Sequence, residues 1–147
     1  MSISVNIKKL SNSAKIPEQA TKADAGFDLC ADIVEPLAIY PHETKKIPTG
    51  IAMSMPTGYW AGIFARSGIA TKRGLAPANK VGVVDCGYRG EIMVALHNHS
   101  DQIQFVEVGE KIAQIVFLPC VYANFIEVDT LDETERGIGG FGSTGTV

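Results

Sequence analysis

Five short segments of the chain combine glycine with polar or charged side chains, and the C-terminal one could close over a ligand. Residues 136–147 read RGIGGFGSTGTV, which is too rich in glycine to join a hydrophobic core. Phe141 could cover a flat ring, while Arg136, Ser143, Thr144 and backbone amides such as that of Gly142 could bind an anion. A disordered tail is the ordinary alternative for such a segment. The order of residue types favours the flap.

A second segment, residues 24–29 (DAGFDL), could contribute a metal ligand. Asp28 follows a glycine bend at the expected start of a strand. With Asp24 close by, two carboxylates near a turn could hold Mg²⁺ directly or through water. An Asx-type turn without a metal would explain the same residues.

A third segment, residues 64–68 (FARSG), suits a phosphate group. Arg66, Ser67 and Gly68 stand at the expected start of a short helix, where unpaired backbone amides favour anions. We predict this helix over residues 67–72, with Ser67 as its N-cap and Gly74 as its terminator. A plain serine cap beside an exposed arginine is the alternative.

A fourth segment, residues 79–91, carries the best candidate for a general base. It is predicted to form a β-hairpin, whose backbone could offer amide and carbonyl groups to the edge of a nucleobase. Asp85 ends an apolar run, where a partly buried carboxylate could act as a base. Tyr88 could pack a ring against a sugar. A hairpin with aspartate at its turn would explain the pattern without chemistry.

The remaining polar features are weaker. Residues 109–114 (GEKIAQ) lack the upstream glycine and the hydroxyl residue of a P-loop, but Gln114 lies inside an apolar strand and needs a partner. His97 and His99 share one side of a strand end, yet no cysteine or carboxylate has the spacing to complete a metal site. Cys86 has no histidine nearby in sequence that would activate it as a nucleophile.

These segments must be positioned by β-strands, because the hydrophobic period is two almost everywhere. Apolar residues alternate with polar ones over residues 3–7 and 92–96, and short apolar runs cover residues 112–118 and 125–128. Glycine or proline turns recur about every 8–12 residues, which is typical of an all-β sandwich or barrel. The only expected helix is the short one at residues 67–72.

Composition limits the possible functions. The chain has 147 residues, is 46% hydrophobic and 20% charged, and carries a net charge of −3. It therefore suits one globular domain, over residues 1–135, followed by a C-terminal flap over residues 136–147. The absence of a basic block argues against nucleic acid as a partner, and no apolar run could cross a membrane. Three widely spaced cysteines indicate reduced thiols, and we expect a cytoplasmic protein.

Taken in their order along the chain, the five segments resemble the five motifs of the trimeric dUTP pyrophosphatases (dUTPases). The segments are residues 24–29, 64–68, 79–91, 109–114 and 136–147. The resemblance runs from about residue 23 to residue 144 and ends in the specific string GGFGSTG. It implies a jelly-roll-like β domain in a homotrimer with active sites shared between subunits. It also implies Mg²⁺-dependent hydrolysis of dUTP to dUMP and pyrophosphate, which limits uracil in DNA and supplies dUMP for dTMP synthesis.

The resemblance also implies a role for each matching residue. Asp85 would hold the attacking water, Tyr88 would lie under the deoxyribose, and Asp28 would help to place hydrated Mg²⁺. Asn79 and the backbone from Gly82 through Val84 to Tyr88 would read uracil. The phosphates would be bound by Arg66, Ser67, Gly68 and Gln114. Phe141 would stack on uracil, and the terminal phosphate would be secured by Arg136, Gly142, Ser143 and Thr144.

Two other functions are open to a chain of this kind. The dCTP deaminases share the fold but use a glutamate on the strand after the hairpin, and the corresponding position here is Ala95. A regulatory module without catalysis would be expected to lack Asp85, Arg66 or the tail, all of which are present.

Overall fold

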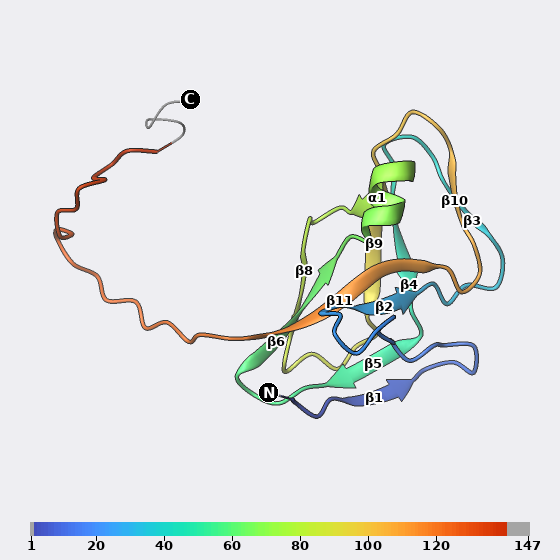
Figure 1. Ribbon diagram of the computed structural model, residues 1–147, viewed down its shortest axis with the longest axis horizontal. Coiled ribbons are helices and arrows are strands. Elements are labelled where there is room, and N and C mark those ends of the chain that lie inside the picture. Colours follow the sequence, from blue (N-terminus) through green and yellow to red (C-terminus); the bar gives the residue numbers. More distant parts are fainter. Residues whose placement is uncertain (1, 141–147) are drawn as a thin grey trace.

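The chain folds mainly as β-structure, which confirms the expectation from its hydrophobic period. The computed structural model describes residues 2–140, and within them the chain forms eleven strands and one short helix (Figure 1). The predicted ligand-binding residues Phe141, Gly142, Ser143 and Thr144 lie outside the described residues. No helix in residues 2–140 has the length and apolar character needed to span a bilayer.

The largest sheet carries most of the predicted site residues. Its antiparallel strands lie in the order β2 (Phe27–Cys30), β11 (Lys111–Pro119), β6 (Tyr59–Phe64) and β8 (Gly82–Asp85). The two outer strands, β2 and β8, are therefore separated by the full width of the sheet.

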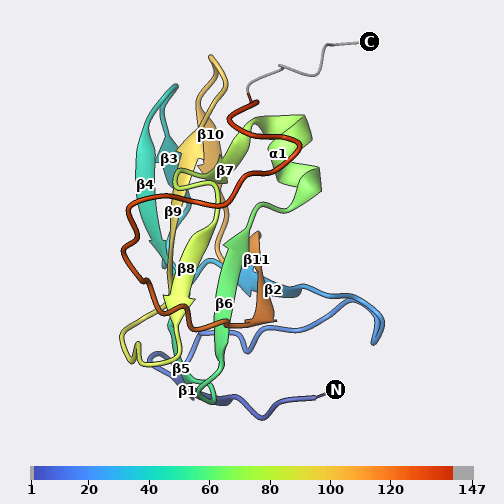
Figure 2. The same ribbon diagram turned by 90° about the vertical axis from the view of Figure 1, so that its left-hand side faces the viewer.

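Three smaller sheets complete the domain (Figure 2). One has the order β4 (Thr44–Pro48), β9 (Met93–Asn98) and β7 (Leu75–Pro77), and the others pair β1 (Asn6–Lys9) with β5 (Ile51–Ser54) and β3 (Leu37–Ile39) with β10 (Gln104–Val106). Side chains such as Ile115 of β11 and Leu96 of β9 are fully buried in one shared core. Burial of this apolar surface is the main force that holds the sheets together.

The predicted helix is present, but its start is displaced by one residue. Helix α1 spans Ser67–Arg73, and Arg66 is its N-cap, with an extended backbone and no capping side-chain hydrogen bond. Ser67 is therefore the first helical residue and not the cap. Gly74 does end the helix, in the left-handed conformation with φ of 68°, as predicted.

The predicted hairpin over residues 79–91 is wrong. β8 pairs with β6, whereas the next strand, β9, pairs with β4 and β7 in a different sheet. Val84 on β8 and Val94 on β9 both point into the core, so the two strands lie in different sheets that share it. A period of two predicts that a strand has one buried face, but it does not say which strand pairs with it.

The apolar run at residues 125–128 forms no strand. After β11 the chain leaves the domain as an extended arm, residues 120–140, which reaches far from the sheets (Figure 1). Phe125 is 94% exposed on this arm, and Val121 and Leu131 are almost as open. The boundary expected between residues 135 and 136 stays a prediction, although the described chain already leaves the sheets after Pro119.

Candidate functional site

The first cluster of predicted site residues lies at the β8 edge of the large sheet. A cavity of about 340 Å³ is lined there by Asn79, Gly82, Val84, Asp85 and Tyr88, together with Lys46, Glu91 and several apolar residues. The sequence placed the first five together in one segment, and the fold gathers them around one hollow. Lys46 comes from β4 and lies outside every predicted segment. Glu91 comes from the loop before β9 and is the last residue of the fourth segment, where its type alone indicated no role.

Asp85 ends β8 and faces solvent at the margin of this cavity. Its backbone carbonyl accepts a hydrogen bond of 3.0 Å from the amide of Tyr88, which closes a tight turn after the strand. Among the described residues, no side chain hydrogen-bonds to the Asp85 carboxylate. The carboxylate is thus held at a fixed strand end with its oxygens available to a water molecule.

A second cluster lies at the β2 edge of the same sheet. Its cavity of about 480 Å³ is lined by Asp28, Arg66, Ser67, Gly68 and Gln114, with Asp24, Gly26 and three apolar residues. The five predicted residues come from three segments between residues 28 and 114. The structure therefore brings three of the polar segments, residues 24–29, 64–68 and 109–114, together around one cavity.

Asp28 is held by two cations. Its carboxylate lies 2.7 Å from Nε of Arg66 and 2.8 Å from Nζ of Lys111, and its side chain is only 15% exposed. Arg66 also donates to the carbonyl of Lys111 at 3.3 Å. Arg66 and Lys111 are two cations that could pair with phosphate oxygens, while the carboxylates of Asp28 and of Asp24, which lines the same cavity, balance their charge.

Lys111 is a site residue that the sequence did not reveal. In a regular strand, Lys111 and Gln114 would point to opposite faces, because successive side chains alternate. A register shift in the pairing of β11 with β2 lies between Lys111 and Ala113, and the consecutive residues Ile112 and Ala113 are both buried. This bulge brings Lys111 to the same side as Gln114, and only its unusual pair of adjacent buried residues could have signalled it.

Gln114 has the partner that its place in an apolar strand required. Its Nε2 donates to the carbonyl of Ala65 at 2.9 Å, which fixes the backbone just before Arg66. Its Oε1 packs against Gly26, where a Cβ atom would clash with it. At Gly68, by contrast, a Cβ atom would meet open space, on the side of the cavity. Gln114 thus shapes the wall of the cavity as well as lining it.

Two ionisable groups near this cavity have perturbed proton affinities. Hydrogen bonds from the side chain and backbone of Thr21 lower the pKa of Asp24, so this carboxylate stays charged. Burial raises the pKa of the Cys30 thiol, which keeps it protonated and unreactive at neutral pH. Cys30, Cys86 and Cys120 are all free.

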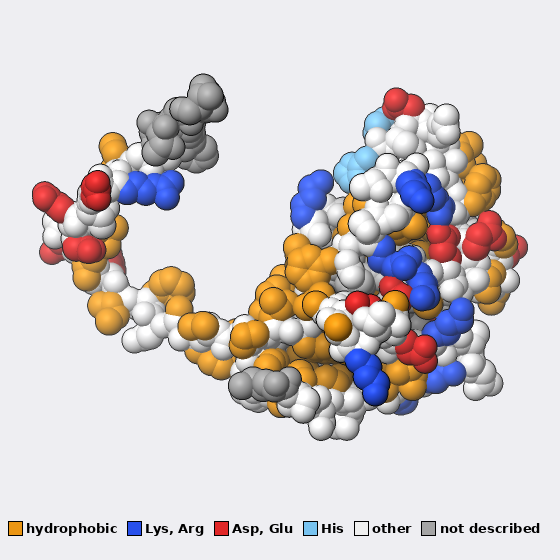
Figure 3. All heavy atoms as spheres, viewed as in Figure 1, with side chains coloured by type: hydrophobic (Ala, Val, Ile, Leu, Met, Phe, Trp, Pro, Cys, Tyr) orange, Lys and Arg blue, Asp and Glu red, His pale blue; other side chains and the backbone are white. Residues whose placement is uncertain are grey.

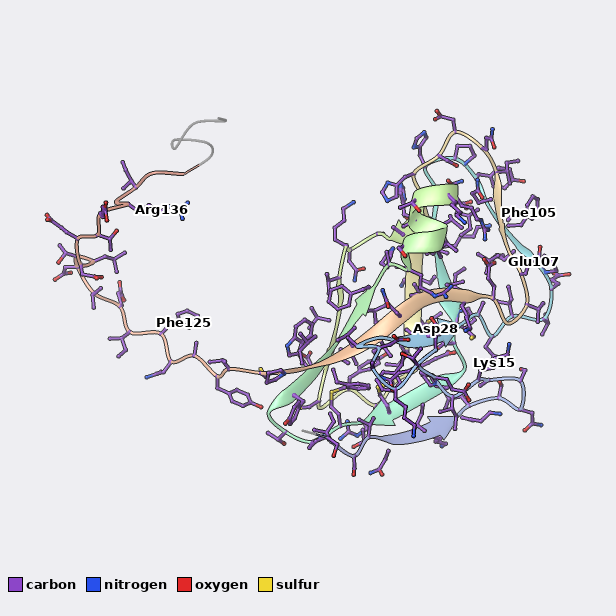
Figure 4. The ribbon with its side chains drawn as sticks, in the orientation of Figure 1. Lys15, Asp28, Phe105, Glu107, Phe125 and Arg136 are labelled. Carbon is purple, nitrogen blue, oxygen red and sulfur yellow. The ribbon has the colours of Figure 1, made fainter. Side chains whose placement is uncertain are left out.

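The remaining described site residue, Arg136, lies far out on the arm (Figure 4). Its Nε donates to the carbonyl of Gly139 at 3.0 Å, and the residue is exposed. Within one chain, the three groups of predicted residues are therefore separate: one at β8, one at β2 and one on the arm. In residues 2–140, no three histidine, cysteine or carboxylate side chains are grouped so as to bind a metal.

The chain is similar to known proteins over nearly its whole length. The dUTPase family model matches residues 12–145. A deoxyuridine 5'-triphosphate nucleotidohydrolase of Desulfitobacterium hafniense is 52% identical over 132 residues, which are 89% of this chain and 87% of the relative. The enzyme of the same description from Gloeobacter violaceus is 44% identical over 143 residues, 97% of each chain.

Solved structures agree in fold. A Staphylococcus bacteriophage 80alpha dUTPase mutant with dUpNHpp superposes with a TM-score of 0.84 at 28% identity, covering 97% of this chain and 99% of that one. A dUTPase mutant from phage phi11 of S. aureus, a structure that concerns the coordination of a structural Mg(II) ion, has a TM-score of 0.76 at 27% identity, covering 86% and 97%. These neighbours share the jelly-roll-like β fold expected from the sequence.

Proposed function

Because this chain belongs to the dUTPase family and is therefore a dUTP-hydrolysing enzyme, we propose that it cleaves dUTP to dUMP and pyrophosphate at a site assembled from several subunits. The observation that carries the proposal is the arrangement of two complementary clusters, one with a free carboxylate and one in which Arg66 and Lys111 could bind phosphate oxygens. Neither a deaminase nor a regulatory module is favoured by any residue of these clusters.

The cluster at β8 binds the nucleoside in this proposal. Asn79 and the backbone from Gly82 to Val84 read the edge of uracil, and Tyr88 packs beneath the deoxyribose. Fixed backbone donors and acceptors would reject cytosine, because the wrong base would leave buried polar groups unpaired. Asp85 takes a proton from the water that attacks the phosphate chain, which is worth on the order of 10²–10⁴ in rate.

The cluster at β2 binds the triphosphate. Arg66, Ser67, Gly68 and Gln114 contact the phosphate oxygens, and Lys111 adds a second cation. Positioned cations stabilise the charge that develops in phosphoryl transfer. Arg136, Phe141, Gly142, Ser143 and Thr144 close over the bound nucleotide and exclude bulk water.

Mg²⁺ fits this cluster as a hydrated ion. The oxygens of Asp28 already pair with Arg66 and Lys111, so direct coordination of a metal by Asp28 would compete with both cations. Mg²⁺ keeps several waters and commonly binds through substrate phosphates, and Asp28 could then accept hydrogen bonds from those waters. When bound, the ion would neutralise charge on the triphosphate.

The separation of the clusters supports a homotrimer with shared sites. In one chain the general base and the phosphate-binding residues lie at opposite edges of the sheet, too far apart to act on one bond. A second copy could bring its β8 edge to the β2 edge of the first. Cyclic symmetry would repeat this contact around a ring, so that each subunit contributes to more than one site.

The exposed arm supports the same assembly. Apolar side chains follow the arm and also gather on the side of the domain from which it leaves (Figure 3). Phe125 and Val121 would be costly to leave in water, because each large apolar side chain gains about 1.5–3 kcal/mol on full burial. A neighbouring subunit is the surface that could cover them, and the arm would then carry the flap to a neighbouring site.

The cellular role follows from the reaction. Removal of dUTP would limit uracil incorporation into DNA, and the dUMP formed would be a precursor of dTMP. We place this activity in the cytoplasm, in keeping with the three free thiols. The proposed partners are the small-molecule substrate dUTP and other copies of the chain. We propose no nucleic acid or membrane as a partner.

The deciding experiment is pyrophosphate release from dUTP, dCTP, dTTP and UTP, each with Mg²⁺ and with EDTA. Metal-dependent release from dUTP alone is expected. Binding of dUTP without release would instead indicate the regulatory module, and consumption of dCTP with ammonia production would indicate the deaminase.

A further inference from the structure

The loop that carries Tyr88 is anchored by contacts that lie behind it. Tyr88 is half exposed at the cavity beside β8, and its Oη donates to the backbone carbonyl of Glu91 at 3.1 Å. Its ring folds back over Gly90, where a Cβ atom would clash with Oη and Cζ. The position of the ring therefore depends on where residues 90 and 91 are held.

Glu91 is fixed in turn by the β4–β5 turn. Its Oε1 accepts a hydrogen bond of 2.8 Å from the amide of Gly50, a residue with a left-handed φ of 66°. The next residue, Ile92, is buried, and its carbonyl accepts a hydrogen bond from the buried hydroxyl of Thr49. A charge-assisted hydrogen bond to a partly buried carboxylate is stronger than a neutral one, so the bond from Gly50 to Glu91 should be the strongest of these contacts.

We propose that Glu91 is a positioning residue for sugar selectivity: by tying its loop to Gly50, it holds Tyr88 where the ring excludes a ribose 2′-hydroxyl. This inference rests on the proposed function, because it assigns Glu91 to the nucleoside end of that site. Glu91 lines the same cavity as Tyr88, but its carboxylate is engaged with the protein backbone. It acts through Tyr88 and not on the phosphate chain.

The test compares Glu91→Ala and Glu91→Gln with wild-type enzyme. For each protein, kcat and KM are measured with dUTP and with UTP, and the ratio of the two kcat/KM values gives the selectivity. Glu91→Ala is expected to lower this ratio by about tenfold or more, since a small displacement of a positioning group is costly. Glu91→Gln keeps an oxygen acceptor for the Gly50 amide and should recover most of the ratio. Glu35→Ala, at an exposed glutamate outside the cavity, is the matched control.

A double variant separates this role from a general loss of structure. If Glu91 acts through Tyr88, then Glu91→Ala should change selectivity much less in a Tyr88→Phe background than in wild type, because coupled residues are not additive. An unchanged ratio in Glu91→Ala, or full additivity with Tyr88→Phe, would overturn the inference. If Glu91→Ala fails to fold, an unchanged ratio in Tyr88→Phe, which keeps the ring but loses its hydrogen bond to the Glu91 carbonyl, would also overturn it. Wild-type enzyme that does not hydrolyse dUTP would overturn the proposed function instead.

Discussion

Asp28 and Asp85 lie on opposite outer strands of the same four-stranded sheet, β2 and β8, with β11 and β6 between them. Three strand spacings separate them by about 14 Å across the sheet. Asp28 is in register with Gln114 and Phe64, whereas Asp85 is opposite Trp60, four residues earlier in β6, so roughly 13 Å is added along the strands. If both residues act on one substrate, as in the proposed function, each chain supplies two half-sites and not one complete site.

The first prediction concerns the general base. Asp85→Asn keeps the shape of the β8 edge but removes the group that accepts a proton from water. We expect turnover of dUTP to fall by about 10²–10⁴, while the Kd for dUTP changes little. Stopped-flow or steady-state turnover, with calorimetric titration of the nucleotide, measures both quantities. Turnover close to wild type would show that Asp85 is not the base.

The second prediction tests the sharing of sites between subunits. Asp85→Asn damages only the β8 half-site, and Arg66→Ala damages only the β2 half-site. After the two inactive proteins are unfolded, mixed in equal amounts and refolded, activity should return to roughly a quarter of wild type, because about three quarters of the trimers are then mixed and each mixed trimer has one intact site out of three. Each variant refolded alone is the control. Sites complete within one chain would give no recovery even when mass spectrometry shows mixed oligomers.

The third prediction distinguishes the role in oligomerisation of the part of the arm before the flap, residues 120–135, from the role in turnover of the C-terminal flap, residues 136–147. A chain that ends at residue 136 keeps the apolar arm and should retain its oligomeric state and Tm, while turnover is largely lost. A chain that ends at Cys120 loses Val121, Phe125 and Leu131 as well, and should dissociate into monomers. Light scattering coupled to size-exclusion chromatography reports the mass. A full oligomer formed without residues 121–147 would contradict the role of the arm.

The fourth prediction concerns the ion pairs of Asp28. Asp28→Asn leaves Arg66 and Lys111 side by side without their shared anion. Because both cations are partly exposed, we expect a modest loss of about 1–2 kcal/mol in the free energy of unfolding, and a raised KM for dUTP. Asp101→Asn removes the partner of His42 in an open ion pair and should change stability by less than about 0.5 kcal/mol. Equal effects of the two substitutions would contradict the importance of Asp28.

The fifth prediction concerns pH. Burial lowers the pKa of His99 below its ordinary value of 6.5, and His97, Lys80 and His42 lower it further. The rings of His97 and His99 lie 4.4 Å apart in an edge-to-face contact, and Nδ1 of His97 lies 2.8 Å from the hydroxyl of Thr44. A histidine whose pKa is lower in the folded state takes up its proton more readily when unfolded. The neutral form of His99 therefore contributes fully to the free energy of unfolding above pH 6.5, and this contribution is lost as the pH falls below that value.

An NMR titration of the imidazole signals measures this shift directly. His97→Gln should raise the pKa of His99, since it removes a neighbouring positive charge, and His99→Gln should flatten the fall in Tm between pH 7 and pH 5. A pKa of His99 at or above 6.5 in the wild-type protein would contradict the prediction.

The sequence alone was sufficient for the fold class and for many of the polar residues that line the two cavities, but not for Lys46. Alternating burial on β9 and the turn at Gly74 are local properties, because they depend on side-chain period and on a residue that tolerates positive φ. The grouping of Asp28 with Arg66 and Gln114 was available only through the resemblance to a family, since these residues are far apart in the chain.

Tertiary structure decided which strands pair and where the polar groups meet. Residues 79–91 were predicted as a hairpin, but β8 and β9 lie in different sheets, because the pattern of burial specifies a face and not a partner. The bulge that brings Lys111 to Asp28 arises from the pairing of β11 with β2, and it cannot be seen in a strand taken alone. The separation of Asp28 from Asp85 is likewise a property of strand order, which depends on contacts across the whole chain and not on the residues of any one motif.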